Sequence, residues 1–270
     1  MNNPIFLTAN GVSLRYEIVG EGPPLFLING FRLHGRAWPT AFLRGLATRF
    51  SVLTYDSRGT GLSDKPIDDY GIATLARDAA GVISAIGLSS AHVLGFSMGG
   101  AVAQELAIRY PSCVDRLVLF ATYAGVGFTI PAAWDAQRRL FDVDSLSPED
   151  AARQVWPVTY SSEFLERNLP FVEAQMRREI VTPTPDHVAR GQRDGLRRFS
   201  SGLRLWQVRA RTLVVTGAED RLVPPGNSRL IASMISGARF ESLSDLGHRA
   251  IWEAPEEIAD FVIDFLESSK

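Results

Sequence analysis

Residues 92–111 read His-Val-Leu-Gly-Phe-Ser-Met-Gly-Gly-Ala-Val-Ala-Gln-Glu-Leu-Ala-Ile-Arg-Tyr-Pro. A short apolar run leads into the pentapeptide Gly95-Phe96-Ser97-Met98-Gly99, and a helical pattern follows it. A G-x-S-x-G sequence between a buried strand and a helix describes a sharp turn that lifts the serine hydroxyl out of the sheet. The turn strains the serine backbone and leaves space only for glycine two residues away. The stretch therefore predicts a nucleophilic Ser97, with the amide of Met98 at a helix N-terminus where it can stabilise an oxyanion.

A nucleophilic serine needs a base, and the base needs an acid that orients it. Among the four histidines of the chain, His248 follows an apolar run at residues 238–243 and precedes a C-terminal helical pattern. In open parallel sheets, ligands bind at the carboxyl ends of the strands, so we predict that His248 is the base. His92 begins the strand that carries the serine and is expected to point away from the turn. His34 and His187 are expected to hold surface or pocket-wall positions.

Asp220 is the predicted acid. Residues 213–217 form a buried-strand pattern, so Asp220 also lies at the carboxyl end of a strand. The neighbouring Glu219 stays open as an alternative, although its longer side chain suits a close contact with histidine less well. The chain order serine, aspartate, histidine is that of a strand–turn–helix hydrolase and differs from the trypsin-like and subtilisin-like orders.

The rest of the chain alternates between strand-like and helical patterns. The later strand-like runs are continuously apolar, which is typical of strands covered on both faces. Helical periodicity appears between the runs, for example over residues 72–86 and 258–266. Alternating strands and helices predict an α/β protein with a mostly parallel sheet and helices on both sides. The strand-like runs are residues 4–8, 12–19, 24–29, 50–56, 90–96, 114–122, 210–218 and 238–245.

Residues 124–207 interrupt this alternation. They carry helical patterns, several prolines and faces rich in arginine and glutamate, without a strand-like run. Their aromatic residues either line an apolar pocket or pack the segment onto the rest of the chain, which is the commoner role at helical spacing. These aromatic residues are Phe128, Trp134, Phe141, Trp156, Tyr160, Phe164, Phe171, Phe199 and Trp206.

Together these patterns resemble the α/β-hydrolase superfamily, and the resemblance runs nearly from end to end. It includes Tyr-Asp-Ser-Arg-Gly-Thr-Gly-Leu-Ser-Asp at residues 55–64, which is similar to the D-x-R-G-x-G-x-S loop that follows the fourth strand in this family. It also includes Gly247-His248 near the end of the chain. The resemblance implies that Asp56 and Arg58 in the first of these loops are structural.

The resemblance also implies a division of the chain. An eight-stranded, mostly parallel sheet flanked by helices would form the α/β-hydrolase core from residues 1–123 and 208–270. A helical cap, residues 124–207, would be inserted after the sixth strand and would cover the active site.

One stretch departs from the family pattern. The family usually has His-Gly after the third strand, followed by a residue whose backbone N–H completes the oxyanion hole, whereas Asn29 stands here before Gly30 and Phe31. Because the donor is a main-chain group, Phe31 is expected to serve together with Met98, and the change affects the support of the loop. With asparagine in place of histidine, this stretch is similar to the 3-oxoadipate enol-lactonase and small esterase branch of the family. Arg32 is either a solvated loop residue or a partner for an anionic substrate group, since guanidinium suits carboxylates.

Length and charge agree with a single enzyme domain. The chain has 270 residues, a formal net charge of −2 and 21% charged residues, which favours neither nucleic acid nor an anionic membrane as a partner. Its single cysteine, Cys113, excludes an internal disulfide. The N-terminus lacks a secretory signal pattern, and no apolar run approaches the length of a membrane span, so a cytoplasmic protein is expected.

These observations predict a cofactor-independent serine hydrolase that cleaves a small carboxylic ester or lactone and holds no metal. Ser97 would attack the carbonyl, His248 would move the proton, Asp220 would orient His248, and the amides of Phe31 and Met98 would hold the oxyanion. Two alternatives stay open: hydrolysis of a carbon–carbon bond in a β-diketone or ring-cleavage product, and a ligand receptor that keeps the triad but turns over slowly. The expected partner is a small-molecule substrate, and a homo-oligomer stays open.

Overall fold

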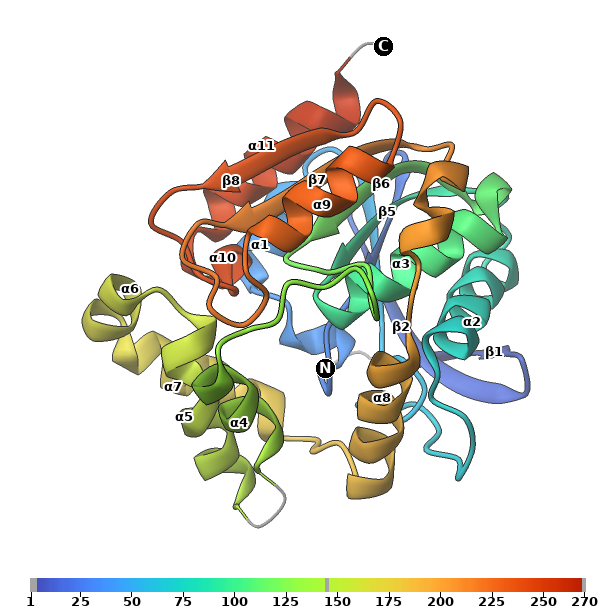
Figure 1. Ribbon diagram of the computed structural model, residues 1–270. Coiled ribbons are helices and arrows are strands. Elements are labelled where there is room, and N and C mark those ends of the chain that lie inside the picture. The colour runs from blue at the N-terminus through green and yellow to red at the C-terminus, as the bar shows by residue number, and fades with distance from the viewer. Residues whose placement is uncertain (1–3, 144–145, 269–270) are drawn as a thin grey trace.

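The computed structural model describes residues 4–143 and 146–268 (Figure 1). Within these residues, eight strands form one sheet in the order β1-β2-β4-β3-β5-β6-β7-β8. Strand β2 runs antiparallel to both of its neighbours, and the remaining pairs are parallel. The predicted α/β-hydrolase architecture is confirmed, and each strand-like run of the sequence coincides with one strand to within two residues at either end. The strands are β1 (Ile5–Ala9), β2 (Val12–Val19), β3 (Pro24–Ile28), β4 (Ser51–Tyr55), β5 (Ala91–Phe96), β6 (Val114–Phe120), β7 (Arg211–Gly217) and β8 (Arg239–Leu243).

The central strands are apolar on both faces because helices cover both sides of the sheet. In β3, Phe26 and Ile28 face one apolar cluster, whereas Leu25 and Leu27 face the other. The first cluster includes α2 (Ile72–Ala85), α3 (Met98–Arg109) and α9 (Gly226–Met234); the second includes α1 (Thr40–Leu46), α10 (Ala250–Glu253) and α11 (Pro255–Glu267). Short 3₁₀ helices are η1 (Gly35–Ala37), η2 (Pro111–Cys113) and η3 (Gly202–Gln207).

Between β6 and β7 the chain leaves the sheet. We call residues 124–207 the inserted segment; it holds five α-helices among its described residues, and η3 at its end. In Figure 1, α4 to α7 gather at the lower left of the sheet, while α8 stands apart from them and packs near α2. The helices are α4 (Trp134–Phe141), α5 (Pro148–Thr159), α6 (Ser162–Arg167), α7 (Leu169–Ile180) and α8 (Asp186–Arg198).

Helix α5 of the inserted segment begins where the sequence supplies a cap. The Ser147 side chain accepts a hydrogen bond from the Asp150 amide, and Pro148 occupies the first turn of α5. Trp156 from α5 and Val172 from α7 join the apolar cluster that includes α11. The segment is therefore packed directly onto the sheet and its flanking helices, which we call the sheet domain. No helix in the described part of the chain is long and apolar enough to cross a membrane.

Candidate active site

Ser97 lies at the sharp turn between β5 and α3, as predicted. Its backbone has φ 54° and ψ −119°, a conformation that residues other than glycine rarely adopt. A β-carbon on Gly95 would lie 2.4 Å from the Gly99 carbonyl oxygen, and one on Gly99 would lie 2.1 Å from the Ile28 carbonyl oxygen. Both positions therefore require glycine. The Thr122 hydroxyl donates to the Ser97 carbonyl at 2.8 Å, which helps to hold the strained residue.

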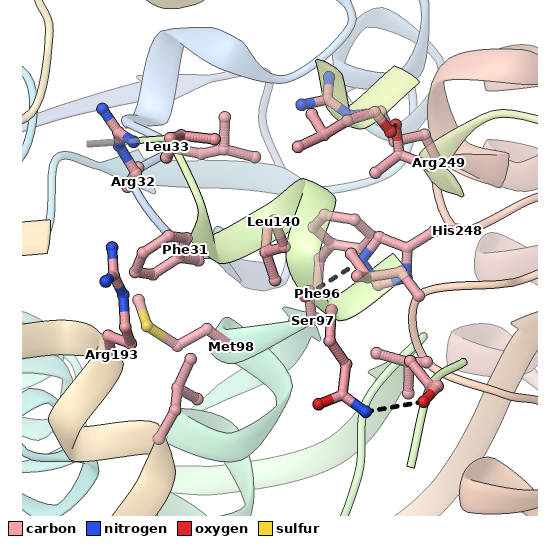
Figure 2. A pocket seen from close by; sticks show the side chains of 18 of the residues that line it. Phe31, Arg32, Leu33, Phe96, Ser97, Met98, Leu140, Arg193, His248 and Arg249 are labelled. Carbon is pink, nitrogen blue, oxygen red and sulfur yellow. Dashed lines mark hydrogen bonds between the residues drawn. The ribbon is translucent and has the colours of Figure 1, made fainter. Parts of the chain in front are cut away.

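The structure brings Ser97, His248 and Asp220 together from three separate loops. The Ser97 Oγ lies 3.1 Å from the His248 Nε2, and the His248 Nδ1 lies 2.7 Å from the Asp220 Oδ2. Figure 2 shows the first of these contacts as a dashed line. The side chains of His248 and Asp220 are buried, and the Phe96 ring packs against the imidazole with 5.0 Å between ring centroids. The arrangement places a hydroxyl, an imidazole and a carboxylate in hydrogen-bonded sequence.

The loop after β7 fixes the carboxylate of Asp220. Its Oδ1 accepts the amides of Leu222 at 2.9 Å and Val223 at 2.7 Å, which leaves Oδ2 for the histidine. Glu219 is exposed to solvent and does not take this place. The geometry therefore favours Asp220 over the alternative that the sequence left open.

Asn29 supports the loop that follows β3. Its side-chain amide donates to the His34 carbonyl at 3.1 Å, and its Oδ1 accepts the Gly30 amide at 2.8 Å. A β-carbon on Gly30 would lie 3.3 Å from the Ser97 Cβ, so the loop runs close against the serine. The asparagine thus braces both ends of this short loop, where the family usually has histidine.

The inserted segment also holds this loop. Arg32 has a left-handed backbone with φ 62°. Its amide donates to the Gln192 Oε1 on α8 at 3.1 Å, and its carbonyl accepts the Thr184 hydroxyl at 2.9 Å. Phe31 and Met98, the two predicted oxyanion donors, both line the cavity beside Ser97.

Ser97 and His248 open into a cavity of about 520 Å³ between the sheet and the inserted segment. In Figure 2, Phe31, Arg32 and Arg193 lie on the opposite side of Ser97 from His248. Of the nine aromatic residues highlighted in the inserted segment, Trp156 lines the cavity. Alanine, proline and larger aliphatic residues make up most of the remaining wall from this segment, and the larger ones are Val126, Ile130, Leu140, Val143, Val155, Ile180 and Leu196.

Trp134 and Trp206 face solvent instead, with exposed fractions of 74% and 71%. Tyr160 is buried, and it stacks on Phe164 with 5.7 Å between ring centroids. The interpretation of these aromatics as packing groups therefore holds for Tyr160 and fails for the two tryptophans. Phe141 is the last residue of α4, and its side chain lies outside the described part of the structure.

The loop that carries His248 is bound to the inserted segment by charged groups that sequence patterns did not reveal. Arg249 forms a two-point ion pair with Glu179 on α7, and its amide donates to the Thr159 carbonyl at 2.7 Å. Burial opposes the charge of Arg249, but the Glu179 carboxylate and Tyr160 outweigh it, so the pKa of Arg249 lies above its usual value.

Glu253 makes a second connection. Its Oε1 accepts the amides of Gly247 at 3.0 Å and Ser161 at 3.1 Å, and its Oε2 accepts the Ser161 hydroxyl at 2.6 Å. Burial raises the pKa of Glu253 in spite of these hydrogen bonds. Because Ser161 also caps α6, one carboxylate joins the histidine loop to the start of a helix.

The D-x-R-G-x-G-x-S loop lies apart from the serine and holds the fold together. Asp56 is fully buried and accepts the amides of Gly35 and Leu62, each at 2.8 Å. Arg58 donates through Nη2 to Asp78 Oδ1 at 2.8 Å. Neither residue lines the cavity at Ser97, which agrees with the structural role that the resemblance implied.

His34 differs from its expected position. Its side chain is 1% exposed, so the prediction of a surface or pocket-wall residue is wrong. It lies at the start of η1, and its carbonyl accepts hydrogen bonds from Asn29 and Ala37. His187 is half-buried, with its Nε2 lying 3.3 Å from the Lys65 carbonyl oxygen.

Comparisons with known proteins agree with this fold. A family model described as alpha/beta hydrolase fold matches residues 23–255. The chain is 28% identical over 263 residues to a 2-hydroxy-6-oxo-6-phenylhexa-2,4-dienoate hydrolase of Comamonas testosteroni, covering 94% of this chain and 91% of that protein.

Two solved structures are similar along nearly the whole chain. A hydrolase from Pseudomonas aeruginosa superposes with a TM-score of 0.85 and 32% identity, covering 98% of this chain and 99% of that one. The enol-lactonase from Burkholderia xenovorans superposes with a TM-score of 0.86 and 25% identity, covering 98% and 100%. The chain therefore belongs to the α/β-hydrolase fold family and is a hydrolytic enzyme.

Proposed function

We propose that the protein is a cofactor-independent serine hydrolase that cleaves a small carboxylic ester or lactone. The observation that carries this proposal is the sequence of contacts from Ser97 Oγ to His248 Nε2 and from His248 Nδ1 to Asp220 Oδ2, at the edge of the cavity. In this arrangement a serine is activated by a base that a buried carboxylate orients.

The proposed reaction has two halves. Ser97 Oγ attacks the carbonyl carbon while His248 Nε2 takes its proton, and Asp220 stabilises the imidazolium that forms. The amides of Phe31 and Met98 hold the negative oxygen of the tetrahedral intermediate. His248 then gives the proton to the leaving alkoxide, and an acyl-enzyme remains. Water, deprotonated by His248, attacks the acyl carbon, and the carboxylic acid leaves as Ser97 regains its proton.

The cavity bears on the class of substrate. Its volume of about 520 Å³ and its mostly aliphatic wall suit a small substrate with an apolar acyl or ring portion. The inserted segment supplies most of that wall, so we propose that residues 124–207 act as the cap that selects the substrate. Arg32 lines the same cavity, and binding of an anionic substituent there is part of the proposal.

A second candidate is hydrolysis of a carbon–carbon bond. The observation that favours it is the likeness to the dienoate hydrolase of Comamonas testosteroni over 94% of this chain. The likeness to an enol-lactonase, with a TM-score of 0.86, supports the first candidate. The same serine and histidine would serve in both reactions, so the substrate rather than the triad separates them.

The test measures hydrolysis of p-nitrophenyl esters, lactones of several ring sizes and a dienoate ring-cleavage product by the wild type and by Ser97→Ala. We expect hydrolysis of esters or lactones, a fall in kcat of about 10⁴ to 10⁶ in the variant, and labelling of Ser97 alone by a fluorophosphonate. Ser233→Ala, at an exposed position on α9, is the control. Activity that survives Ser97→Ala would reject the mechanism.

The same panel decides between the candidate functions. Cleavage of the dienoate substrate with no hydrolysis of esters or lactones would replace the first candidate with the second. A fluorophosphonate-reactive Ser97 combined with turnover slower than about one per minute on every substrate would indicate the ligand receptor, since enzymes typically turn over at about 1 s⁻¹ or faster.

A further inference from the structure

A second concavity lies between the sheet domain and α7 of the inserted segment. It encloses about 600 Å³ and shares none of its described lining residues with the cavity at Ser97. Its walls come from β2, β4, η1, α1 and α7. We call it the arginine groove, because it is lined by Arg36, Arg44, Arg177 and Arg178.

Positive charge is concentrated in this groove although the chain carries a formal net charge of −2. Glu17 is the single acidic residue among its described lining residues, and its carboxylate already contacts the Arg15 guanidinium. Arg177 lies 3.9 Å from Glu173 in a pair whose side chains are both exposed, and such pairs are worth little. Four arginines thus line one groove with little compensation from acids.

The contacts of Arg36 and Arg178 are with neutral groups. Arg178 donates to the Thr40 hydroxyl and to the Arg36 carbonyl, each at 3.2 Å. Arg36 donates to the Thr182 hydroxyl at 3.5 Å, which is at the limit of a hydrogen bond. The Arg36 Nε is buried and has no hydrogen-bond partner among the residues that the structure describes. Among the described residues neither guanidinium has a carboxylate partner, and an anion in the groove would supply that counter-charge.

We propose that the arginine groove binds a small phosphate-bearing anion with two or more negative charges. Guanidinium groups match phosphate oxygens in shape and charge, and they bind them through paired hydrogen bonds. Val19, Leu43, Val52 and Val181 form apolar parts of the same wall, so the site suits a phosphate attached to an organic body.

The position of the groove gives the ligand a structural effect. Arg178 lies on α7, whereas Arg36 lies on η1 of the sheet domain, so one bound anion would join the two. Helix α7 also carries Glu179, which pairs with Arg249 next to His248. Binding is therefore expected to slow amide hydrogen exchange in α7. The arginine groove is separate from the cavity at Ser97, so anion binding there does not depend on the proposed ester or lactone chemistry.

The test is calorimetric titration of the full chain at constant ionic strength with phosphate, tripolyphosphate, ATP without metal, and adenosine. We expect one site per chain, tighter binding of tripolyphosphate and ATP than of phosphate, and no binding of adenosine. Tighter binding of ATP than of tripolyphosphate would assign the organic body to the valine and leucine wall, and equal binding would assign the site to the phosphates alone.

Variants locate the site. Arg36→Gln and Arg178→Gln should each weaken tripolyphosphate binding by about tenfold or more, because each removes a charge-assisted contact. Arg44→Gln should also weaken tripolyphosphate binding. Because Arg44 is exposed, this variant is expected to fold normally and tests the site even if Arg36→Gln or Arg178→Gln does not fold. Arg190→Gln removes the same charge from an exposed position on α8 outside the groove and should leave binding within about twofold.

Three results would overturn the inference. They are the absence of saturable binding, equal weakening by Arg190→Gln and the groove variants, and unchanged binding in an Arg36→Gln, Arg178→Gln double variant that folds normally. Ser97→Ala should bind tripolyphosphate as the wild type does. The binding test can therefore fail or succeed independently of the test of the proposed reaction.

Discussion

Arg249 and Glu179 form a two-point ion pair across 70 positions of the chain, with an Nη1–Oε1 distance of 2.6 Å and an Nη2–Oε2 distance of 3.0 Å. Arg249 directly follows His248, and Glu179 belongs to the inserted segment. The side chains are 13% and 12% exposed, so the pair is largely removed from water. The position of the imidazole is thereby tied to the position of α7.

Glu179→Gln should lower the free energy of unfolding by about 3 kcal/mol, because it leaves a buried guanidinium without its counter-charge. Glu173→Gln is the matched control: Glu173 lies on the same helix, its pair with Arg177 is exposed, and its loss should cost less than about 0.5 kcal/mol. Urea denaturation measures both. Equal losses in the two variants would contradict a structural connection through Arg249.

Asp220→Asn should lower kcat by about 10⁴, because the amide favours the wrong histidine tautomer. Glu219→Gln, one residue away and exposed, should leave kcat nearly unchanged. Steady-state kinetics on the best ester or lactone measures the difference. A larger loss from Glu219→Gln would move the acid to that position.

Asn29→Ala should lower kcat more than it changes KM, because the Gly30 amide beside Ser97 loses its partner and the His34 carbonyl keeps only the Ala37 amide. The expected loss of stability is about 1–3 kcal/mol for the unpaired buried amide. Asn29→Asp keeps the acceptor for Gly30 but not the donor to His34, and it should retain more activity than Asn29→Ala. An alanine variant with unchanged kcat would show that the loop holds its shape without this side chain.

Trp156→Ala should change the ranking of substrates by kcat/KM, since truncating an apolar wall of a substrate cavity changes discrimination by about 1–3 kcal/mol. Trp134→Ala removes the same side chain from the same segment, but at a position 74% exposed and outside the cavity wall, and should leave the ranking unchanged. The rate of Ser97 labelling by a very small phosphonate should stay within about tenfold in both. A parallel loss of labelling and hydrolysis in Trp156→Ala would mean that it supports the catalytic geometry.

Acid should destabilise the protein through His34 and His92. Burial lowers the pKa of both imidazoles, so the unfolded chain takes up protons near pH 6.5 that the folded chain does not bind. The free energy of unfolding should therefore fall as the pH drops below about 6.5, by at most about 1.4 kcal/mol per pH unit for each site.

Urea denaturation between about pH 5 and 7.5 measures this slope, since the ordinary pKa of histidine lies in that range. His92→Gln, at the half-buried start of β5, should reduce the slope below pH 6.5, and His34→Asn should reduce it further in the double variant. His187→Gln, whose ring is half-buried beside Lys65, is the control. An unchanged slope in the double variant would place the acid sensitivity in other groups.

The features that the sequence predicted are those that local patterns encode. Continuous apolar runs mark strands buried on both faces, and the glycines at 95 and 99 mark the turn because a β-carbon there would meet backbone oxygens. Ser97, Asp220 and His248 meet because each follows a strand that ends at the same edge of the sheet. The apolar runs and Gly95 reflect requirements among near neighbours, whereas Gly99 also has to clear the Ile28 carbonyl on β3.

The missed features depend on contacts between distant parts of the chain. Glu179 belongs to an arginine- and glutamate-rich helix, and nothing in its neighbourhood distinguishes it from solvated carboxylates such as Glu173. The same reason explains why Trp134 faces solvent and His34 is buried: the direction of each side chain depends on how the segments are packed. Periodicity predicts a helix but does not determine which partner the helix meets.

The carboxylate of Glu253, shared between Gly247 and Ser161, bears on engineering by segment exchange. A foreign insert grafted between β6 and β7 would arrive without the serine hydroxyl that binds the Glu253 Oε2 and without the glutamate that faces Arg249. Both recipient side chains would then be left as partly buried charged groups without these partners, close to His248 in the chain. A successful chimera must therefore transplant three things together: the insert, the residue at 249 and the residue at 253.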